Sequence, residues 1–227
     1  MNINKLQRRK SVRKKLCQSL FLMLLAIIFF VLCIGKWKIM QGAKMVGGFI
    51  GGHDRTPCRS DDFVVGEFPL FLQADERWAD TAYGSGEMAE TGCGPTCLSM
   101  VVCALRENDE WMPPRMAKWA EKSGYYVAGA GTAWAMMSEG AGEFGISVKE
   151  ITLSEERVFK ELKKGHPIIC TMGPGHFTTQ GHYIVLYGLD DSGGIRIRDP
   201  KSRENSEKVW KLEDITPEIK NLWSYSI

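Results

Sequence analysis

The sequence has no acidic residue before Asp54, and it has no residue of either charge between Leu16 and Gly35. These 20 uncharged residues could cross a membrane as a helix, because its hydrocarbon core needs about 20 apolar residues. Residues 1–15 carry seven basic side chains, which the positive-inside rule keeps in the cytoplasm. We therefore expect a basic cytoplasmic tail at 1–15 and a transmembrane signal anchor at 16–35, with the rest of the chain extracellular. Secretion after cleavage of a signal peptide is the alternative.

Basic residues are less frequent than acidic ones in the rest of the chain. Residues 36–227 hold 22 of the 29 lysines and arginines and all 27 acidic residues, a net charge of −5. A nucleic-acid surface needs clustered basic side chains with aromatic ones for stacking. We therefore expect no nucleic-acid partner. The chain also lacks internal repeats, and its 44% of hydrophobic residues can form one globular core.

Glycine-rich sequence precedes the predicted domain. Residues 36–66 have six glycines and no sustained hydrophobic periodicity, which is typical of a linker. The apolar run that follows Glu67 marks the expected start of a folded domain, 67–227.

The two halves of this domain differ in their predicted elements. Proline near a helix start, serine or threonine caps and terminal glycines indicate helices in the first half, and short apolar runs indicate strands in the second. This order predicts an α+β fold, with a helical first half packed on a C-terminal antiparallel sheet. The expected helices are 94–105, 113–122, 133–144 and 155–164, and the expected strands are 167–172, 182–189, 195–198 and 222–227.

Five of the seven cysteines lie outside the apolar segment, so at least one thiol is unpaired there. Cys93 stands between two glycines at the predicted start of the first helix. A helix N-terminus stabilises a thiolate, and the N–H of Cys93 is placed to bind an oxyanion. The alternative is a small buried residue in a tight turn. Cys97 follows one turn later, inside the helix, where we expect it to be less accessible.

Only four histidines could serve as a base for this thiol. His53 lies in the linker, and His166 lies in a turn where its side chain is expected to face water. His176 lies in a glycine-flanked loop, which suits a mobile or substrate-contacting role. His182 begins an apolar strand directly after a glycine and is the better candidate for the base. A core-edge histidine with satisfied hydrogen bonds is the alternative.

A histidine base needs an acceptor for its second ring nitrogen. The predicted turn at 191–194 returns the chain so that Asp199 lies at the same end of the sheet as His182. Asp190 and Asp191 are alternatives, but they lie at the far end of the hairpin and are expected to be turn residues.

The order Gln, Gly-Cys-Gly-Pro-Thr, Gly-His-Tyr-Ile-Val-Leu and Asp-Pro resembles the C39-like peptidase family of the papain-like clan, over nearly all of residues 67–227. The resemblance implies that Cys93 is the nucleophile, His182 the general base and then acid, and Asp199 the residue that orients the imidazole. It also implies that Gln73 donates to the oxyanion hole. Gln73 precedes Cys93 by 20 positions, more than in papain, so this interval must loop out. A polar residue at the end of a strand is the alternative for Gln73.

Together these features predict a stand-alone, membrane-anchored cysteine peptidase that acts on extracellular peptides or proteins and needs no cofactor or metal. One alternative is an amidase or endopeptidase of cell-wall peptides, and another is a non-catalytic peptide-binding surface protein. A zinc site of Cys93, Cys97, His176 and His182 matches no common ligand spacing.

Overall fold

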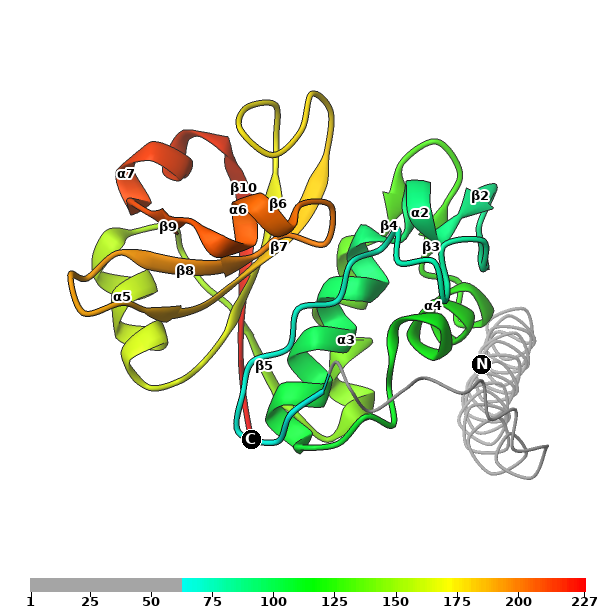
Figure 1. The fold of residues 1–227 in the computed structure, drawn as a ribbon, viewed down its shortest axis with the longest axis horizontal. Helices are drawn as coiled ribbons and strands as arrows, with labels where there is room; N and C mark the ends of the chain where they lie inside the picture. The colour runs from blue at the N-terminus through cyan, green and yellow to red at the C-terminus, as the bar shows by residue number, and fades with distance from the viewer. Residues whose placement is uncertain (1–62) are drawn as a thin grey trace, which may run out of the picture. The chain divides into compact units, whose positions relative to one another are not determined.

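The computed structural model describes residues 63–227, which form a helical half and a sheet half that lie side by side (Figure 1). The predicted tail, membrane anchor and nearly all of the linker lie outside the described residues. Within 63–227, no helix combines the length and the hydrophobicity that crossing a membrane requires.

Two longer helices dominate the helical half. Both begin with proline close to the first position, where its missing N–H costs nothing. Their bounds confirm the prediction from the sequence to within one residue. The elements of this half are β1 (Ala82–Tyr83), β2 (Gly86–Glu87), α2 (Met88–Thr91), α3 (Cys93–Arg106), α4 (Pro113–Lys122), β3 (Tyr126–Val127), β4 (Gly131–Thr132), η2 (Trp134–Met136) and η3 (Ala141–Phe144).

The predicted helix at 133–144 is wrong. The structure has two short 3-10 helices there, η2 and η3. Glycine inside a helix costs about 1 kcal/mol relative to alanine, and this segment contains two glycines. A Cβ at Gly140 would lie 2.9 Å from the Tyr125 ring and 3.0 Å from the Trp119 ring. The glycine therefore permits close packing against two aromatic rings, and the helix is broken at this point.

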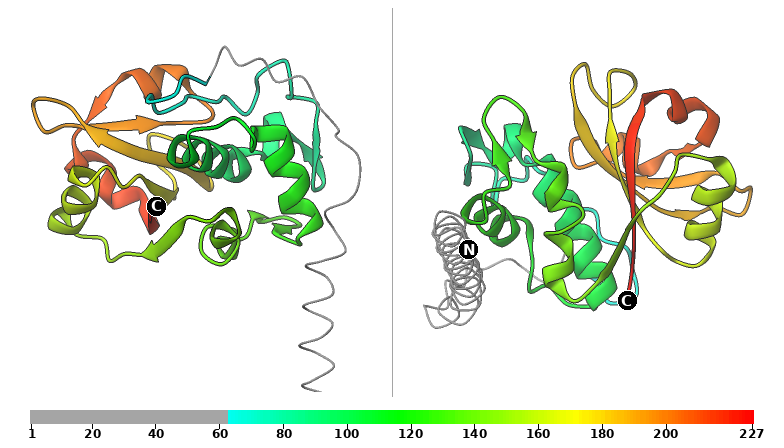
Figure 2. Two further views of the ribbon diagram at one scale, coloured as in Figure 1. Left: turned by 90° about the horizontal axis from the view of Figure 1, so that it is seen from below. Right: turned by 180° about the vertical axis from the view of Figure 1, so that it is seen from behind.

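The sheet half is one antiparallel sheet of six strands in the order β5-β10-β6-β7-β8-β9, with the C-terminal strand inside it (Figure 2). The four predicted strands are present, and Ser154 caps α5 as predicted by accepting a hydrogen bond from the Arg157 N–H. The elements are β5 (Ser147–Glu150), α5 (Glu155–Lys163), β6 (Ile168–Met172), β7 (His182–Leu189), β8 (Ile195–Arg198), α6 (Arg203–Glu207), β9 (Val209–Trp210), α7 (Leu212–Ile215), η4 (Thr216–Glu218) and β10 (Ile219–Ser226).

The central strands are buried on both faces. Alternate residues of β7 point to opposite sides of the sheet, so that Tyr183 and Val185 pack with the helical half while Ile184 and Leu186 pack toward α5 and α7. Burying a side chain of this size stabilises the fold by about 1.5–3 kcal/mol. The two hydrophobic clusters hold β7 rigidly, and its first residue is His182.

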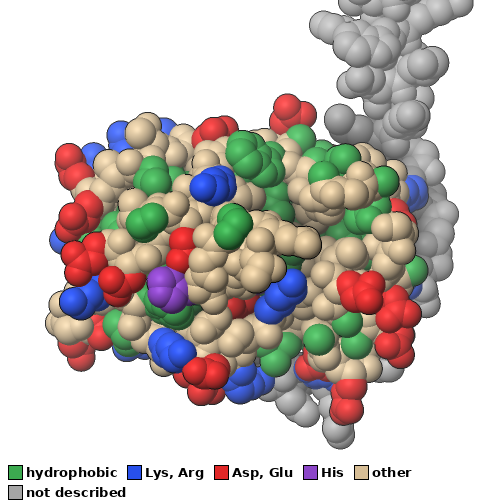
Figure 3. Space-filling view, turned by 90° about the horizontal axis from the view of Figure 1, so that it is seen from above, with side chains coloured by type: hydrophobic (Ala, Val, Ile, Leu, Met, Phe, Trp, Pro, Cys, Tyr) green, Lys and Arg blue, Asp and Glu red, His purple; other side chains and the backbone are tan. Residues whose placement is uncertain are grey.

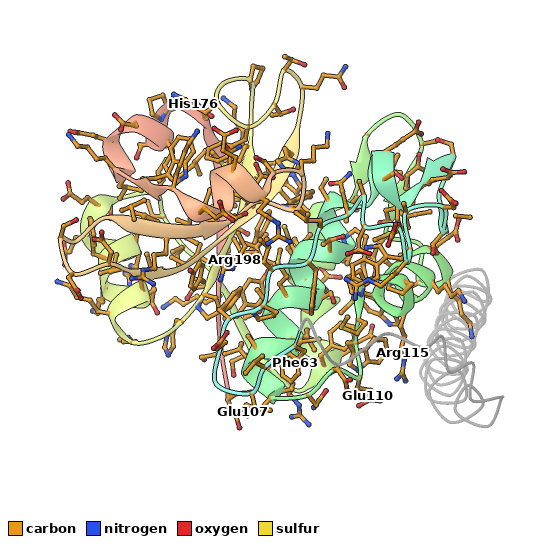
Figure 4. All side chains as sticks on the ribbon, in the orientation of Figure 1. Phe63, Glu107, Glu110, Arg115, His176 and Arg198 are labelled. Carbon is orange, nitrogen blue, oxygen red and sulfur yellow. The ribbon has the colours of Figure 1, made fainter. Side chains whose placement is uncertain are left out.

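The first described segment connects the two halves. Arg198 on β8 donates a hydrogen bond to the Phe68 carbonyl oxygen at 3.0 Å, and its guanidinium lies 4.4 Å from the Tyr187 ring centroid (Figure 4). The N–H of Gln73 donates to the Pro200 carbonyl oxygen at 2.8 Å. The segment before the helices is thereby fixed to the strand end that carries Asp199.

Candidate active site

Cys93 is the first residue of α3, and its side chain is half-buried. The first N–H groups of a helix have no partner within the helix, and together with the helix dipole they favour a negative charge at this position. The neighbouring glycines have a packing role that the sequence did not reveal. A Cβ at Gly94 would lie 2.5 Å from Thr132 Oγ1, and one at Gly92 would lie 2.6 Å from the Met88 carbonyl oxygen.

His182 and Asp199 form a buried pair on neighbouring strands. Val185 pairs with Arg198, and continuing this register by one residue sets Asp199 opposite Ile184. Because Ile184 and His182 point to the same face of β7, Asp199 lies diagonal to His182 on that face. His182 Nε2 donates to Asp199 Oδ1 at 2.7 Å, and the two side chains are 0% and 1% exposed. The other ring nitrogen, Nδ1, is buried and has no partner of regular hydrogen-bond geometry within residues 63–227. It is the nitrogen left for the Cys93 thiol.

Two further residues hold Asp199, and sequence reasoning missed both. Asn205 Nδ2 donates to Asp199 Oδ2 at 2.8 Å, and the Asp199 N–H donates to Ser206 Oγ at 2.8 Å. Both residues belong to α6, a helix of five residues that Ser202 caps through the Asn205 N–H. Ser202, which follows Pro200 by two positions and is a preferred N-cap residue type, was the signal that could have predicted this cap.

The thiol and the imidazole shift each other's pKa. Burial raises the pKa of Cys93, but a hydrogen bond to His182 and the charge of its ring outweigh burial, so the pKa lies below its usual value. Burial lowers the pKa of His182, but hydrogen bonds to Asp199 and Cys93 outweigh it and raise the pKa to about 9. Because thiolate and imidazolium stabilise each other, the pair titrates as a unit. Between the two pKa values the site holds a charged nucleophile.

A cleft of about 730 Å³ opens at this pair. The sheet half contributes the start of β7, the end of β6 and the loop between them, and the helical half contributes α2, the start of α3 and the segment around β4. Its lining includes Cys93, Thr132, Trp134, Met172, Gly173, Gln180, Gly181, His182, Lys201 and Lys220. The half-buried thiol of Cys93 and the buried His182 are thus both part of the wall of one cleft.

The model of the Peptidase_C39 like family matches residues 65–226. The chain belongs to this family. Membership indicates a peptidase. A search of curated proteins found no significant match. Among solved structures, the peptidase domain of Streptococcus ComA, a bi-functional ABC transporter involved in a quorum sensing pathway, is 22% identical, with a TM-score of 0.48. The match covers 70% of this chain and 98% of that one.

Gln73 of this C39-like chain is close to the site but outside the cleft lining. Its side chain is fully buried, and Nε2 donates to the Ala89 carbonyl oxygen at 2.7 Å. Its Oε1 is buried without a hydrogen-bond partner in the described part of the chain. The residue lies between Ala89, four positions before Cys93, and Pro200, which follows Asp199. Its role as an oxyanion-hole donor stays a prediction.

The other thiols of the domain, those of Cys97, Cys103 and Cys170, are buried, which confirms the prediction that Cys97 is less accessible than Cys93. Cys97 Sγ donates to the Tyr183 carbonyl oxygen at 3.3 Å, and burial raises its pKa well above the usual value. Burial likewise raises the pKa of Cys170. These sulfurs pack as small hydrophobic groups, and Cys103 belongs to the core of the helical half.

Two other histidines pair with carboxylates outside the site. His166 Nδ1 lies 2.8 Å from Glu161 Oε2, so this side chain, which is 29% exposed, binds a carboxylate as well as facing water. His176 pairs with the buried Glu218 through both its ring and its backbone N–H, and its ring contacts Trp210. Figure 4 shows His176 at the outer edge of the sheet half. His176 is therefore anchored to Glu218, and the prediction of a mobile role is wrong.

Charged side chains of both signs are interspersed on the face seen from above (Figure 3). Basic and acidic groups alternate there with hydrophobic and uncharged ones, and no broad area of one sign dominates this view.

Proposed function

We propose that this protein is a papain-like cysteine peptidase that hydrolyses peptide or amide bonds through Cys93, His182 and Asp199. The observation that carries the proposal is the meeting of three elements at one cleft. The thiol stands at the start of α3, the imidazole begins β7, and the carboxylate belongs to the residue that follows β8. A thiolate paired with an imidazolium, whose ring a carboxylate orients, is the arrangement that acyl transfer needs.

The reaction begins when the Cys93 thiolate attacks the carbonyl carbon of the scissile bond. The carbonyl oxygen takes up the electron pair, and the N–H of Cys93 at the helix start stabilises the oxyanion. Gln73 is the proposed second donor, as the family resemblance implies. His182 then gives its proton to the leaving amine, and the bond between carbon and nitrogen breaks. Water, deprotonated by His182, hydrolyses the thioester and restores the thiol.

Asp199 keeps the imidazole in position during these steps. Its carboxylate accepts hydrogen bonds from His182, from the Lys201 N–H and from Asn205, so three donors fix it. With Nε2 bound to Asp199, the proton that moves in the reaction is the one on Nδ1. None of these steps needs a metal or an organic cofactor.

The test is intact-protein mass spectrometry of the full chain during turnover of peptide esters and amides. We expect a covalent acyl adduct that forms in the wild type and in Cys97→Ala but not in Cys93→Ala. Linear peptides and cell-wall peptides serve as parallel substrates, and cleavage of the latter alone would favour the amidase alternative. An adduct that persists in Cys93→Ala would contradict the proposal.

We also propose that the catalytic domain acts outside the membrane, held by residues 16–35 with residues 1–15 in the cytoplasm. The support is the uncharged stretch and its basic flank. A membrane-impermeant protease applied to intact cells should remove the domain, while a cytoplasmic marker survives. Recovery of the domain in the medium, shortened at its N-terminus, would instead favour a cleaved signal peptide.

A further inference from the structure

Two lysines without acidic partners line the cleft on the sheet half. Lys201 and Lys220 are both exposed, and neither forms an ion pair with any acidic side chain of residues 63–227. By contrast, Lys208 pairs with Glu204 at 2.7 Å outside the cleft. Charged side chains that line a binding cleft without a partner are free to bind a charged substrate.

Lys201 stands beside the catalytic pair. It follows Asp199 by two positions, and its N–H donates to Asp199 Oδ1 at 2.9 Å. Its backbone is thus fixed to the carboxylate that orients His182, while its side chain is exposed at the cleft. The charge of Lys201 also lowers the pKa of Cys93, by less than His182 and a backbone hydrogen bond at Tyr183 do.

Lys220 lies on the opposite side of His182. Ile219 pairs with Met172, and Met172 pairs with His182. Ile219 is therefore two strands, or about 10 Å, from His182, and Lys220 is the next residue along β10. A Cβ at Gly173 would collide with Lys220 Cε, which means that the lysine side chain lies directly across this glycine. The Lys220 side chain thus lies over a glycine that also lines the cleft.

The acidic residues near these lysines are engaged elsewhere or lie across the cleft. Glu218 is buried and bound to His176, and Glu150 accepts a hydrogen bond from Asn221. Glu90, which also lines the cleft, belongs to α2 in the helical half. The positive charge therefore follows the sheet side of the cleft, on both sides of the imidazole.

We propose that the cleft selects peptides that carry carboxylates flanking the scissile bond, one bound by Lys201 and one by Lys220. This inference rests on the proposed peptidase function and specifies its substrate class. The carboxylate at either lysine has two possible sources, an acidic side chain or the C-terminus of the substrate. Exposed pairs of this kind are weak, so we expect each lysine to change selectivity by about two- to fivefold.

The test compares four peptides cleaved by the full chain. One sequence carries glutamate on both sides of the scissile bond and the other carries glutamine there, and each of these two sequences is made with a free and with an amidated C-terminus. We expect kcat/KM to be higher for the glutamate peptides, and high salt should reduce the difference because it screens exposed charges. If only the free C-terminus raises kcat/KM, the carboxylate that the lysines bind is the C-terminal one.

Variants then assign the selectivity to each residue. Lys201→Gln and Lys220→Gln should each lower the ratio of the rates for glutamate and glutamine peptides, whereas Lys208→Gln should leave it unchanged. The inference is overturned if the wild type cleaves all four peptides equally, and this result would leave the peptidase proposal intact. If no peptide is cleaved, binding of the same four peptides to Cys93→Ala decides the question. Equal affinities of Cys93→Ala for all four peptides would then overturn the inference as well.

Discussion

Two histidine–carboxylate pairs of the sheet half, His182 with Asp199 and His176 with Glu218, differ in burial and in their neighbours. The His182 and Asp199 side chains are 0% and 1% exposed, whereas those of His176 and Glu218 are 54% and 9% exposed. His182 lies beside the Cys93 thiol, and His176 packs edge-on against Trp210 with ring centroids 5.5 Å apart. A histidine–carboxylate pair is therefore insufficient to mark a catalytic site.

The second pair holds the loop between β6 and β7. Glu218 accepts the His176 N–H with its carboxylate and the Gly173 N–H with its carbonyl oxygen. Parts of the same loop line the cleft. We interpret His176 and Glu218 as an anchor for one wall of the cleft, and His182 and Asp199 as the catalytic pair. Each prediction below contrasts the catalytic region with a matched position outside it.

The largest effect is expected for the nucleophile. Cys93→Ala should lower kcat by about 10⁴- to 10⁶-fold, because removing the nucleophile of a catalytic triad eliminates covalent catalysis. Cys97→Ala should stay within a few-fold of the wild type, since that thiol is buried and hydrogen-bonded to Tyr183. The measurement is steady-state hydrolysis of a peptide substrate. Equal losses in both variants, with both proteins folded, would contradict the assignment of the nucleophile.

The next effect is expected for the two histidines. His182→Ala should lower kcat by about 10²- to 10⁴-fold, the usual contribution of a general acid–base group. His176→Ala should lower kcat/KM by less than about tenfold, because His176 acts only through the loop. Circular dichroism and thermal unfolding check that both variants are folded. A greater loss of activity in His176→Ala than in His182→Ala would indicate that His176, and not His182, is the acid–base group.

A smaller effect is expected in the pH dependence. The thiolate forms above a pKa that lies below the usual thiol value, and the imidazolium is lost as pH rises through about 9. The profile of kcat/KM should therefore be bell-shaped, with its alkaline limb near pH 9. Asp199→Asn removes a negative charge that raises the pKa of His182, so this limb should move to lower pH. The alkaline limb should not move in Glu218→Gln. An equal shift in both variants would argue against Asp199 as the partner of His182.

The smallest effect is expected when the loop anchor alone is weakened. Glu218→Gln keeps the size of the side chain but removes its charge, which lowers the strength of a charge-assisted hydrogen bond by roughly half. We expect KM to rise by about two- to fivefold with kcat little changed, because the substrate contacts the loop in the ground state and the transition state alike. A fall in kcat with constant KM would place Glu218 in the chemistry instead.

The sequence predicted much of this site because its signals are local. The proline near the start of α3 and the glycine before β7 each mark the beginning of an element, and Cys93 and His182 stand at those two points. The turn at 191–194 fixed the hairpin and therefore the end of the sheet to which Asp199 returns. Placing a residue at an element boundary needs no knowledge of distant packing.

The parts that the sequence did not predict depend on distant contacts. The predicted helix at 133–144 fails because Gly140 packs on Trp119 and Tyr125, which no local pattern reveals. β5 has mostly exposed residues, so it gives no hydrophobic alternation, and it is a strand only because β10 pairs with it. Asn205 reaches Asp199 from a helix of five residues, too short for a periodic signal.

The central claim is that Cys93 is a thiolate because His182 is beside it. The most direct measurement is the rate of alkylation of Cys93 by a small thiol reagent as a function of pH, followed by peptide mapping in the wild type and in His182→Ala. We predict that Cys93 of the wild type reacts well below the usual thiol pKa, and that in His182→Ala its reactivity rises only near that value. Identical pH profiles in the two proteins, or faster labelling of Cys97 than of Cys93, would contradict the claim.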